Sequence, residues 1–226
     1  AHAMQTFVGT NKLLLQPHQS TLAQLMAMRL AKSPGSSLVY DEETLTTEET
    51  LDLVDIFTYR LLQDGVNPGD HVVCQLAPSW ECCILGWSVM KMGAVLVPFE
   101  PGIPIPEGVS PPKLAFHSLV QLEEWLEDWD EEERTIPKIS GSDCATVLHT
   151  SGTTGSPKGV PLTHHQLVES AMAMTVHFEL NDESVLMMNS SIETMSGLRN
   201  SLFLPWTCGG GVAICPLEQP FVPARL

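Results

Sequence analysis

A predicted strand that leads straight into a loop of hydroxyl and glycine residues most constrains how this 226-residue chain can fold. The apolar run 145–148 is typical of a buried strand, and residues 150–159 are rich in Ser, Thr and Gly and contain a single lysine, Lys158. Glycine lets the backbone turn tightly and approach a ligand, so hydroxyls and backbone amides can converge on phosphate oxygens. Lys158 adds a mobile positive charge. The sequence therefore predicts a phosphate-binding loop at the end of a strand.

This loop differs from a Walker loop, which needs a glycine immediately before its lysine and a Ser or Thr immediately after it. Here Pro157 precedes Lys158 and Gly159 follows it. A flexible Ser/Thr/Gly linker is the alternative interpretation, which the preceding strand disfavours. A nucleophilic serine at Ser151 is disfavoured as well, because the Gly-x-Ser-x-Gly pattern of hydrolases is missing.

The composition indicates a packed globular protein and excludes two classes of partner. The chain is 43% hydrophobic and has a mean hydropathy of +0.07, as folded domains do. Its formal net charge of −16 argues against binding to nucleic acid or to an anionic membrane, since both need a basic surface. The six cysteines show no Cys-x-x-Cys spacing, so we predict no zinc site and no disulfide framework. A reducing, cytoplasmic location is expected.

No secretory signal or membrane span is predicted. Residues 1–5 are interpreted as a vector remnant in front of a native start. The apolar run 82–99 barely reaches the length of a span and contains Lys91, Gly93 and Pro98, so it favours a buried helix followed by a buried strand.

Helical and strand patterns alternate along the chain, which predicts an α/β fold with a mainly parallel sheet. The predicted helices cover residues 22–30, 51–61 after a cap at Thr47, 80–92 after a cap at Ser79, 119–133, and 164–178 after a cap at Thr163. The predicted strands cover residues 38–40, 72–76, 94–97, 145–148, 185–188 and 212–215. Residues 101–112 are rich in proline and glycine and are interpreted as a loop.

Three stretches resemble one known family. The run from Asp143 through the loop to Leu167 resembles the phosphate-loop signature of the adenylate-forming superfamily, which includes acyl-CoA synthetases, peptide-synthetase adenylation domains and luciferases. Residues 89–101, ending in Val-Pro-Phe-Glu-Pro, and residues 65–73 are similar to further elements of that family. The resemblance extends over roughly residues 20 to 217.

The resemblance implies a domain organisation. Residues 6–226 would form the N-terminal part of an AMP-binding (adenylation) domain: mainly parallel sheets flanked by helices, without the small C-terminal subdomain. The Pro-rich loop would lie at 101–112 and the phosphate-loop half at 140–226. Family members have another helix and strand before the phosphate loop, and the interval from Pro101 to Asp143 is short for both.

The resemblance also implies a reaction. A small-molecule carboxylic acid would attack the α-phosphate of ATP, giving an acyl-adenylate and pyrophosphate, and the acyl group would pass to the thiol of coenzyme A or of a carrier-protein phosphopantetheine. The partners implied are therefore a carrier protein or neighbouring synthetase domains. Lys158, as the catalytic residue, would offset the phosphate charge together with Mg²⁺. The residues expected to bind ATP are Thr150, Ser151, Gly152, Thr153, Thr154, Gly155 and Lys158.

Several parts of the family pattern are missing, which leaves catalysis open. The sequence lacks the aromatic-Gly-x-Thr-Glu segment whose Glu holds Mg²⁺, so no metal ligand is assigned. The ribose-binding Asp and the C-terminal catalytic Lys have no counterpart before Leu226. We expect the 226 residues alone to be inactive. The alternative function is a non-catalytic, truncated adenylation-like scaffold or docking module of a multidomain synthetase.

The acid pocket also departs from the family. Where relatives carry an aromatic-His or Phe-Asp pair before a Gly, this chain has Ser190–Gly197. Glu193 and Gly197 are the candidate substrate residues, with Glu193 either pairing a substrate ammonium or lying in a solvated loop. Two interpretations of His149 stay open: it contacts the nucleotide, or it packs within its strand. His164 and His165 are placed in the first turn of a helix, and Trp87 and Trp206 in the core.

Overall fold

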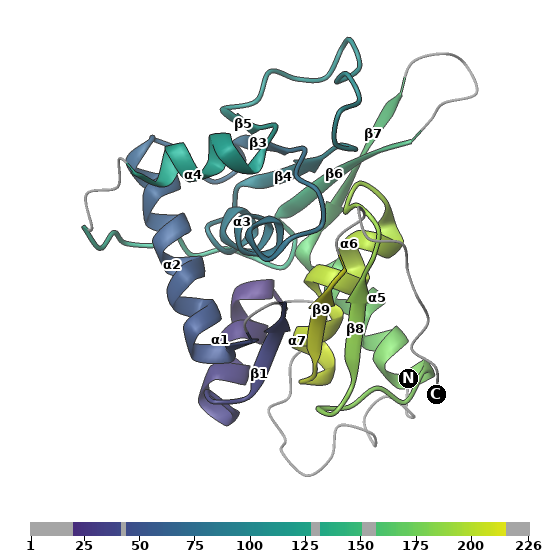
Figure 1. Cartoon of the computed structure of the whole chain (residues 1–226). Coiled ribbons are helices and arrows are strands. Elements are labelled where there is room, and N and C mark those ends of the chain that lie inside the picture. Colours follow the sequence, from purple (N-terminus) through teal and green to yellow (C-terminus); the bar gives the residue numbers. More distant parts are fainter. Residues whose placement is uncertain (1–19, 42–43, 128–131, 151–156, 216–226) are drawn as a thin grey trace.

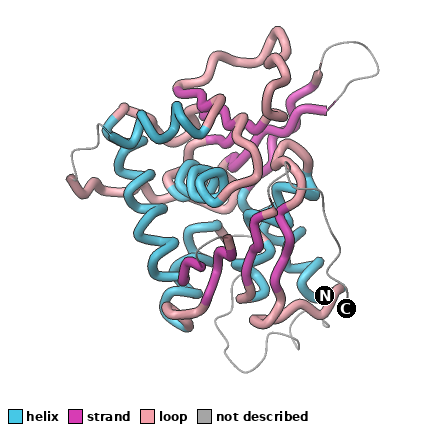
Figure 2. The backbone as a smooth tube through the Cα atoms, in the orientation of Figure 1, coloured by secondary structure: helices cyan, strands magenta, loops and turns pink. Residues whose placement is uncertain are grey.

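The computed structural model describes residues 20–41, 44–127, 132–150 and 157–215, which form two sheets flanked by helices (Figures 1 and 2). The four-stranded sheet has the order β2-β1-β9-β8 and the five-stranded sheet the order β5-β3-β4-β6-β7. The strands are β1 Ser37–Tyr40, β2 Thr44–Thr46, β3 His71–Cys74, β4 Val95–Pro98, β5 Leu114–Phe116, β6 Cys144–Thr150, β7 Lys158–Thr163, β8 Val185–Met188 and β9 Gly211–Ile214. The helices are α1 Leu22–Lys32, α2 Thr47–Gln63, α3 Trp80–Lys91, α4 Leu119–Glu127, α5 His164–His177, α6 Met195–Leu202 and α7 Leu204–Cys208.

Most strand pairs are parallel, which confirms the predicted α/β class. In the five-stranded sheet β3 pairs in parallel with β4 and β5, and β4 pairs in parallel with β6. In the other sheet β9 pairs in parallel with β1 and β8. The antiparallel pairs among the described strands, β1–β2 and β6–β7, are at sheet edges. No described helix is both long enough and apolar enough to cross a membrane.

Helix α3 is buried on almost every side and lies between the two sheets (Figure 1). Its Trp87 is fully buried, packs edge-to-face on Trp206 of α7 at 5.2 Å, and donates from Nε1 to the carbonyl oxygen of Leu202 at 2.9 Å. Cys83 lies with its Sγ 3.5 Å from Sδ of Met188, the last residue of β8. The expected core positions of Trp87 and Trp206 are confirmed.

One crossover between parallel strands contains no helix. The chain goes from β4 back past β3 to β5 through residues 99–113, all of which are described and none of which is helical. Parallel strands are usually joined by a helix. Because crossovers are right-handed and the chain here crosses the sheet in the direction opposite to that from β3 to β4, residues 99–113 lie on the face opposite α3. There Ile105 and Val109 cover the buried cluster Val73, Val95, Val97 and Phe99. The short interval after Pro101 therefore still contains a strand and a helix, β5 and α4, but no helix between β4 and β5.

Two predicted helix boundaries were wrong. Helix α2 is capped by Thr46, whose hydroxyl accepts from the backbone of Glu49 while the Glu49 carboxylate accepts from the Thr46 amide. Thr47, the predicted cap, is the first residue of the helix and is buried. Its hydroxyl accepts a hydrogen bond from Arg29 Nε at 2.8 Å. Helix α4 ends at Glu127 instead of continuing to residue 133; residues 128–131 are outside the described part, and 132–133 are not helical.

Arg29 of α1 is 5% exposed and joins four elements. Its guanidinium donates to the carbonyl oxygens of Pro205, Gly210 and Ser37 and to the hydroxyls of Thr47 and Ser36. None of these partners is a carboxylate. Burial lowers the pKa of Arg29, partly offset by Cys208 and Tyr40.

Candidate phosphate-binding and acid-binding site

The hairpin β6–β7 carries the predicted phosphate loop at its tip. Thr150, the last residue of β6, pairs with Lys158, the first residue of β7, and both side chains are exposed. The Thr150 hydroxyl lies 3.5 Å from the Lys158 carbonyl oxygen. Five predicted ligands of the phosphates are outside the described residues: Ser151, Gly152, Thr153, Thr154 and Gly155. Thr150 and Lys158 thus bracket the loop, and Lys158 forms no ion pair with any described residue.

Behind the hairpin, His149 packs against Phe99 instead of being directed at the loop. The two rings are 4.8 Å apart and tilted by 30°. Gly159 pairs with His149 across the hairpin, and a Cβ at Gly159 would lie 2.9 Å from Val147 Cγ1 and 3.2 Å from His149 Nε2. This close approach explains why glycine is suited to the position after Lys158. Of the two interpretations of His149, the packed one describes its place in this structure.

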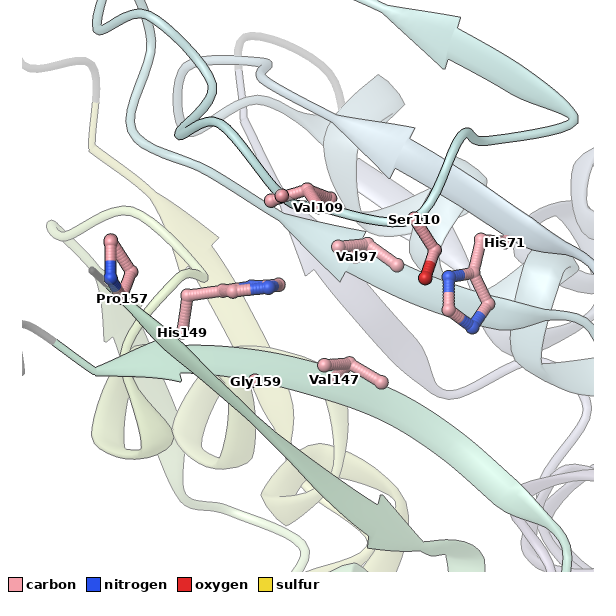
Figure 3. A pocket seen from close by; sticks show the side chains of 9 residues that line it. His71, Val97, Val109, Ser110, Val147, His149, Pro157 and Gly159 are labelled. Carbon is pink, nitrogen blue, oxygen red and sulfur yellow. The ribbon is translucent and has the colours of Figure 1, made fainter.

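A cavity of about 190 Å³ opens beside this stack, and His71, Ser110 and His149 line it from three different segments (Figure 3). Burial lowers the pKa of His149, and the nearby His71 lowers it further, so the neutral form of His149 is favoured. The described residues contain no group of three or more His, Cys, Asp or Glu side chains arranged to hold a metal ion.

Helix α5 begins directly after the hairpin and is anchored by a buried histidine. Thr163 caps the helix, and His164 and His165 lie in its first turn, as predicted. His164 is fully buried, and its Nδ1 accepts a hydrogen bond from the backbone amide of Leu22 at 3.5 Å. Its Nε2 has no hydrogen-bond partner in the described part of the chain. Burial lowers the pKa of His164 to about 4, and the nearby Asp143 opposes the shift.

The turn after β8 holds the candidate acid-binding residues. Glu193 is half-buried, and its Oε2 is inaccessible and has no hydrogen-bond partner among the described residues. The Ser191 hydroxyl is buried in the same way, again with no described group to bond to. A solvated carboxylate, one of the two sequence interpretations, therefore does not describe this oxygen. Burying polar groups without partners is costly, so such atoms in a native fold call for a compensating contact.

Gly197 lies in the first turn of α6, where its amide donates to the hydroxyl of the cap Thr194 at 3.1 Å. A Cβ at this position would lie 2.2 Å from the Ser191 carbonyl oxygen. Gly197 therefore allows the turn 190–194 to pack closely on α6, and this packing holds Ser191 and Glu193 in place.

Comparison with known proteins decides the family. The family model described as AMP-binding enzyme matches residues 109–226, more than half of the chain. The chain belongs to the AMP-binding enzyme family. Gramicidin S synthase 2 of Brevibacillus brevis is 26% identical over 221 residues, and malpibaldin synthetase of Mortierella alpina is 26% identical over 219 residues. These alignments cover 90% and 84% of this chain but only 5% and 4% of those synthetases.

Solved structures of the same architecture confirm the predicted fold. The N-terminal subdomain of NpsA from Klebsiella oxytoca superposes with a TM-score of 0.76 at 18% identity, covering 90% of this chain and 57% of that one. VinN superposes with a TM-score of 0.75 at 20% identity, covering 87% of this chain and 57% of that one. The chain thus has the fold of the N-terminal part of an adenylate-forming enzyme and spans little more than half of these relatives.

Proposed function

We propose that the chain is part of a domain that uses ATP and Mg²⁺ to activate a carboxylic acid as an acyl-adenylate. Residues 6–226 would be the N-terminal part of that domain, with the Pro-rich loop at 101–112 and the phosphate-loop half at 140–226. Membership of the AMP-binding family and the fold it shares with adenylation enzymes support this proposal.

The observation that carries the proposal is an exposed ammonium at the base of the hairpin loop that pairs with no described carboxylate. The chain has a net charge of −16, so a polyphosphate needs a local cation, and Lys158 begins β7 opposite the Thr150 hydroxyl. Thr150 and Lys158 fit a triphosphate, since a hydroxyl and an ammonium both donate to phosphate oxygens. Mg²⁺, when bound with the nucleotide, would neutralise further phosphate charge.

The turn 190–197 would hold the acid. Glu193 Oε2 and the Ser191 hydroxyl are buried acceptors without partners among the described residues, and a substrate that brings hydrogen-bond donors would satisfy them. An acid that carries an ammonium group would supply such donors. The acyl group would then pass to the thiol of coenzyme A or of a carrier-protein phosphopantetheine, with the carrier or a neighbouring synthetase domain as partner.

Replacement of Lys158 by alanine should weaken nucleotide binding. Loss of one charge-assisted hydrogen bond costs roughly 1.5–3 kcal/mol, or about 10- to 100-fold in affinity. Titration with Mg²⁺–ATP, followed by the thermal unfolding temperature, should raise that temperature for the wild type and raise it less for Lys158→Ala. The matched control is Lys138→Ala, because Lys138 is also exposed but lies in the loop before β6.

Equal stabilisation of wild type and Lys158→Ala by Mg²⁺–ATP would contradict the role given to Lys158. Absence of any shift for the wild type would favour the non-catalytic scaffold instead. Loss of the shift in both lysine variants would indicate a general charge effect and not a site at the hairpin.

A further inference from the structure

Two cysteines from neighbouring elements contact each other in the core. Cys74 ends β3, and Cys82 lies in the first turn of α3, where its amide donates to the cap Ser79 at 3.1 Å. Their Sγ atoms are 4.0 Å apart, and both side chains are almost fully buried. All six cysteines of the chain lie in its described part, and each is a free thiol.

From this juxtaposition we infer that Cys74 and Cys82 are an oxidisable dithiol, which a hydroperoxide converts into a disulfide between β3 and α3. A disulfide needs its sulfurs at about 2.05 Å, so the two Sγ atoms must approach by roughly 2 Å. The chain between them, residues 75–81, is a short turn and the start of α3, so the inference requires a local adjustment of this segment.

The chemistry balances with one molecule of hydrogen peroxide. The Cys74 sulfur attacks a peroxide oxygen, the O–O bond breaks, and a sulfenic acid and one water form. The Cys82 sulfur then attacks the sulfenic sulfur; the S–S bond forms, the S–O bond breaks, and the departing hydroxide takes the Cys82 proton to give a second water. Two thiols and one hydrogen peroxide thus yield one disulfide and two waters.

The hydrogen bond between the sulfurs sets the order of these steps. Either sulfur can be the donor in this contact. The contact lowers the pKa of Cys74, whereas the same contact and burial raise the pKa of Cys82. Because the thiolate is the nucleophile, Cys74 reacts first and Cys82 resolves the sulfenic acid. Burial slows the first step, so the oxidant must enter when the turn after β3 opens locally.

The turn between the two cysteines also holds the Pro-rich loop. Gln75, next to Cys74, donates from Nε2 to the carbonyl oxygens of Glu100 and Ile103 at 3.2 and 2.7 Å. Its Oε1 must therefore accept from His117, whose Nδ1 lies 2.5 Å away. Closing the dithiol shifts the segment that carries Gln75, and hence the anchor of residues 99–113.

The test is oxidation of the folded 226-residue chain with hydrogen peroxide, followed by denaturation, alkylation with N-ethylmaleimide and non-reducing peptide mapping. The expected result is one cross-linked peptide pair joining Cys74 to Cys82, with loss of those two alkylation sites and their recovery after dithiothreitol. Cys83→Ser is the matched control, since Cys83 is equally buried on the same helix, and this variant should keep the cross-link.

A wild-type chain in which Cys74 and Cys82 both stay alkylatable after peroxide would overturn the inference, and so would a cross-link that joins Cys74 to Cys83. The same mapping on the chain oxidised in urea separates folding from chemistry. A Cys74–Cys82 link formed equally well in urea would show that the fold does not create the pair.

Discussion

Replacement of Arg29 by methionine should destabilise the protein by roughly 1–3 kcal/mol, the range for leaving a buried hydrogen-bonding group without its partner. The side chain is 5% exposed and donates to three backbone carbonyl oxygens, those of Ser37, Pro205 and Gly210. Methionine fills much of the volume but donates nothing, so these carbonyl groups lose a partner in a place that water does not reach. Urea unfolding followed by tryptophan fluorescence measures the loss.

Two further substitutions serve as controls. Lys32→Met, at an exposed position on the same helix, should change stability by less than about 0.5 kcal/mol. Arg29→Lys keeps the charge but cannot reach five acceptors in a planar fork, so it should lie between the wild type and Arg29→Met. Equal stability of Arg29→Met and Lys32→Met would show that the hydrogen bonds of Arg29 contribute nothing net.

Stability should fall as the pH drops from 6.5 to 4, and His164 should account for part of that fall. The unfolded histidine has a pKa near 6.5, whereas burial lowers the pKa of folded His164 to about 4. In this window the unfolded chain binds the extra proton, so protonation favours unfolding. The contribution of His164 is fully present above pH 6.5 and lost at pH 4; at about 1.4 kcal/mol per pKa unit it amounts to roughly 3 kcal/mol.

His164→Asn isolates this contribution. Asparagine retains an acceptor for the Leu22 amide but does not titrate, so the free energy of unfolding should depend less on pH between 6.5 and 4 than in the wild type. His177→Asn, at an exposed position at the end of the same helix, should leave the wild-type pH dependence unchanged. Identical slopes for wild type and His164→Asn would contradict a neutral buried histidine.

Elements with local signals could be predicted from the sequence. Ser79 and Thr163 begin helices in the structure as predicted, because a cap hydroxyl three residues before a free amide is a short-range pattern. Strand β7 was missed because Gly159 and Pro161 weaken the strand pattern. Both are tolerated because β7 is an edge strand whose pairing with β6 is antiparallel. Helix α7 was missed because Pro205 resembles a helix breaker, although proline is compatible with the first turn of a helix.

The role of the loop in binding phosphate stays a prediction, and the surroundings of the candidate site could not be predicted. The loop was located from its hydroxyls and glycines, and the structure places its bracketing residues Thr150 and Lys158 opposite each other. The burial of Glu193 Oε2 could not be predicted, since it depends on how α6 packs through Gly197, a contact between backbone atoms. Likewise, Thr46 and not Thr47 caps α2 because Arg29, distant in sequence, takes up the Thr47 hydroxyl.

The position of α3 has a consequence for how the molecule loses its structure. This one buried helix is bonded to elements of both halves: Trp87 donates to the Leu202 carbonyl oxygen of α6, Ser88 donates to the Val54 carbonyl oxygen of α2, and Cys83 contacts Met188 of β8. The halves therefore cannot separate without exposing buried side chains of α3 to water. The two sheets are therefore expected to melt in a single cooperative step, the more so because β1 and β2 precede the strands of the five-stranded sheet in the chain while β8 and β9 follow them.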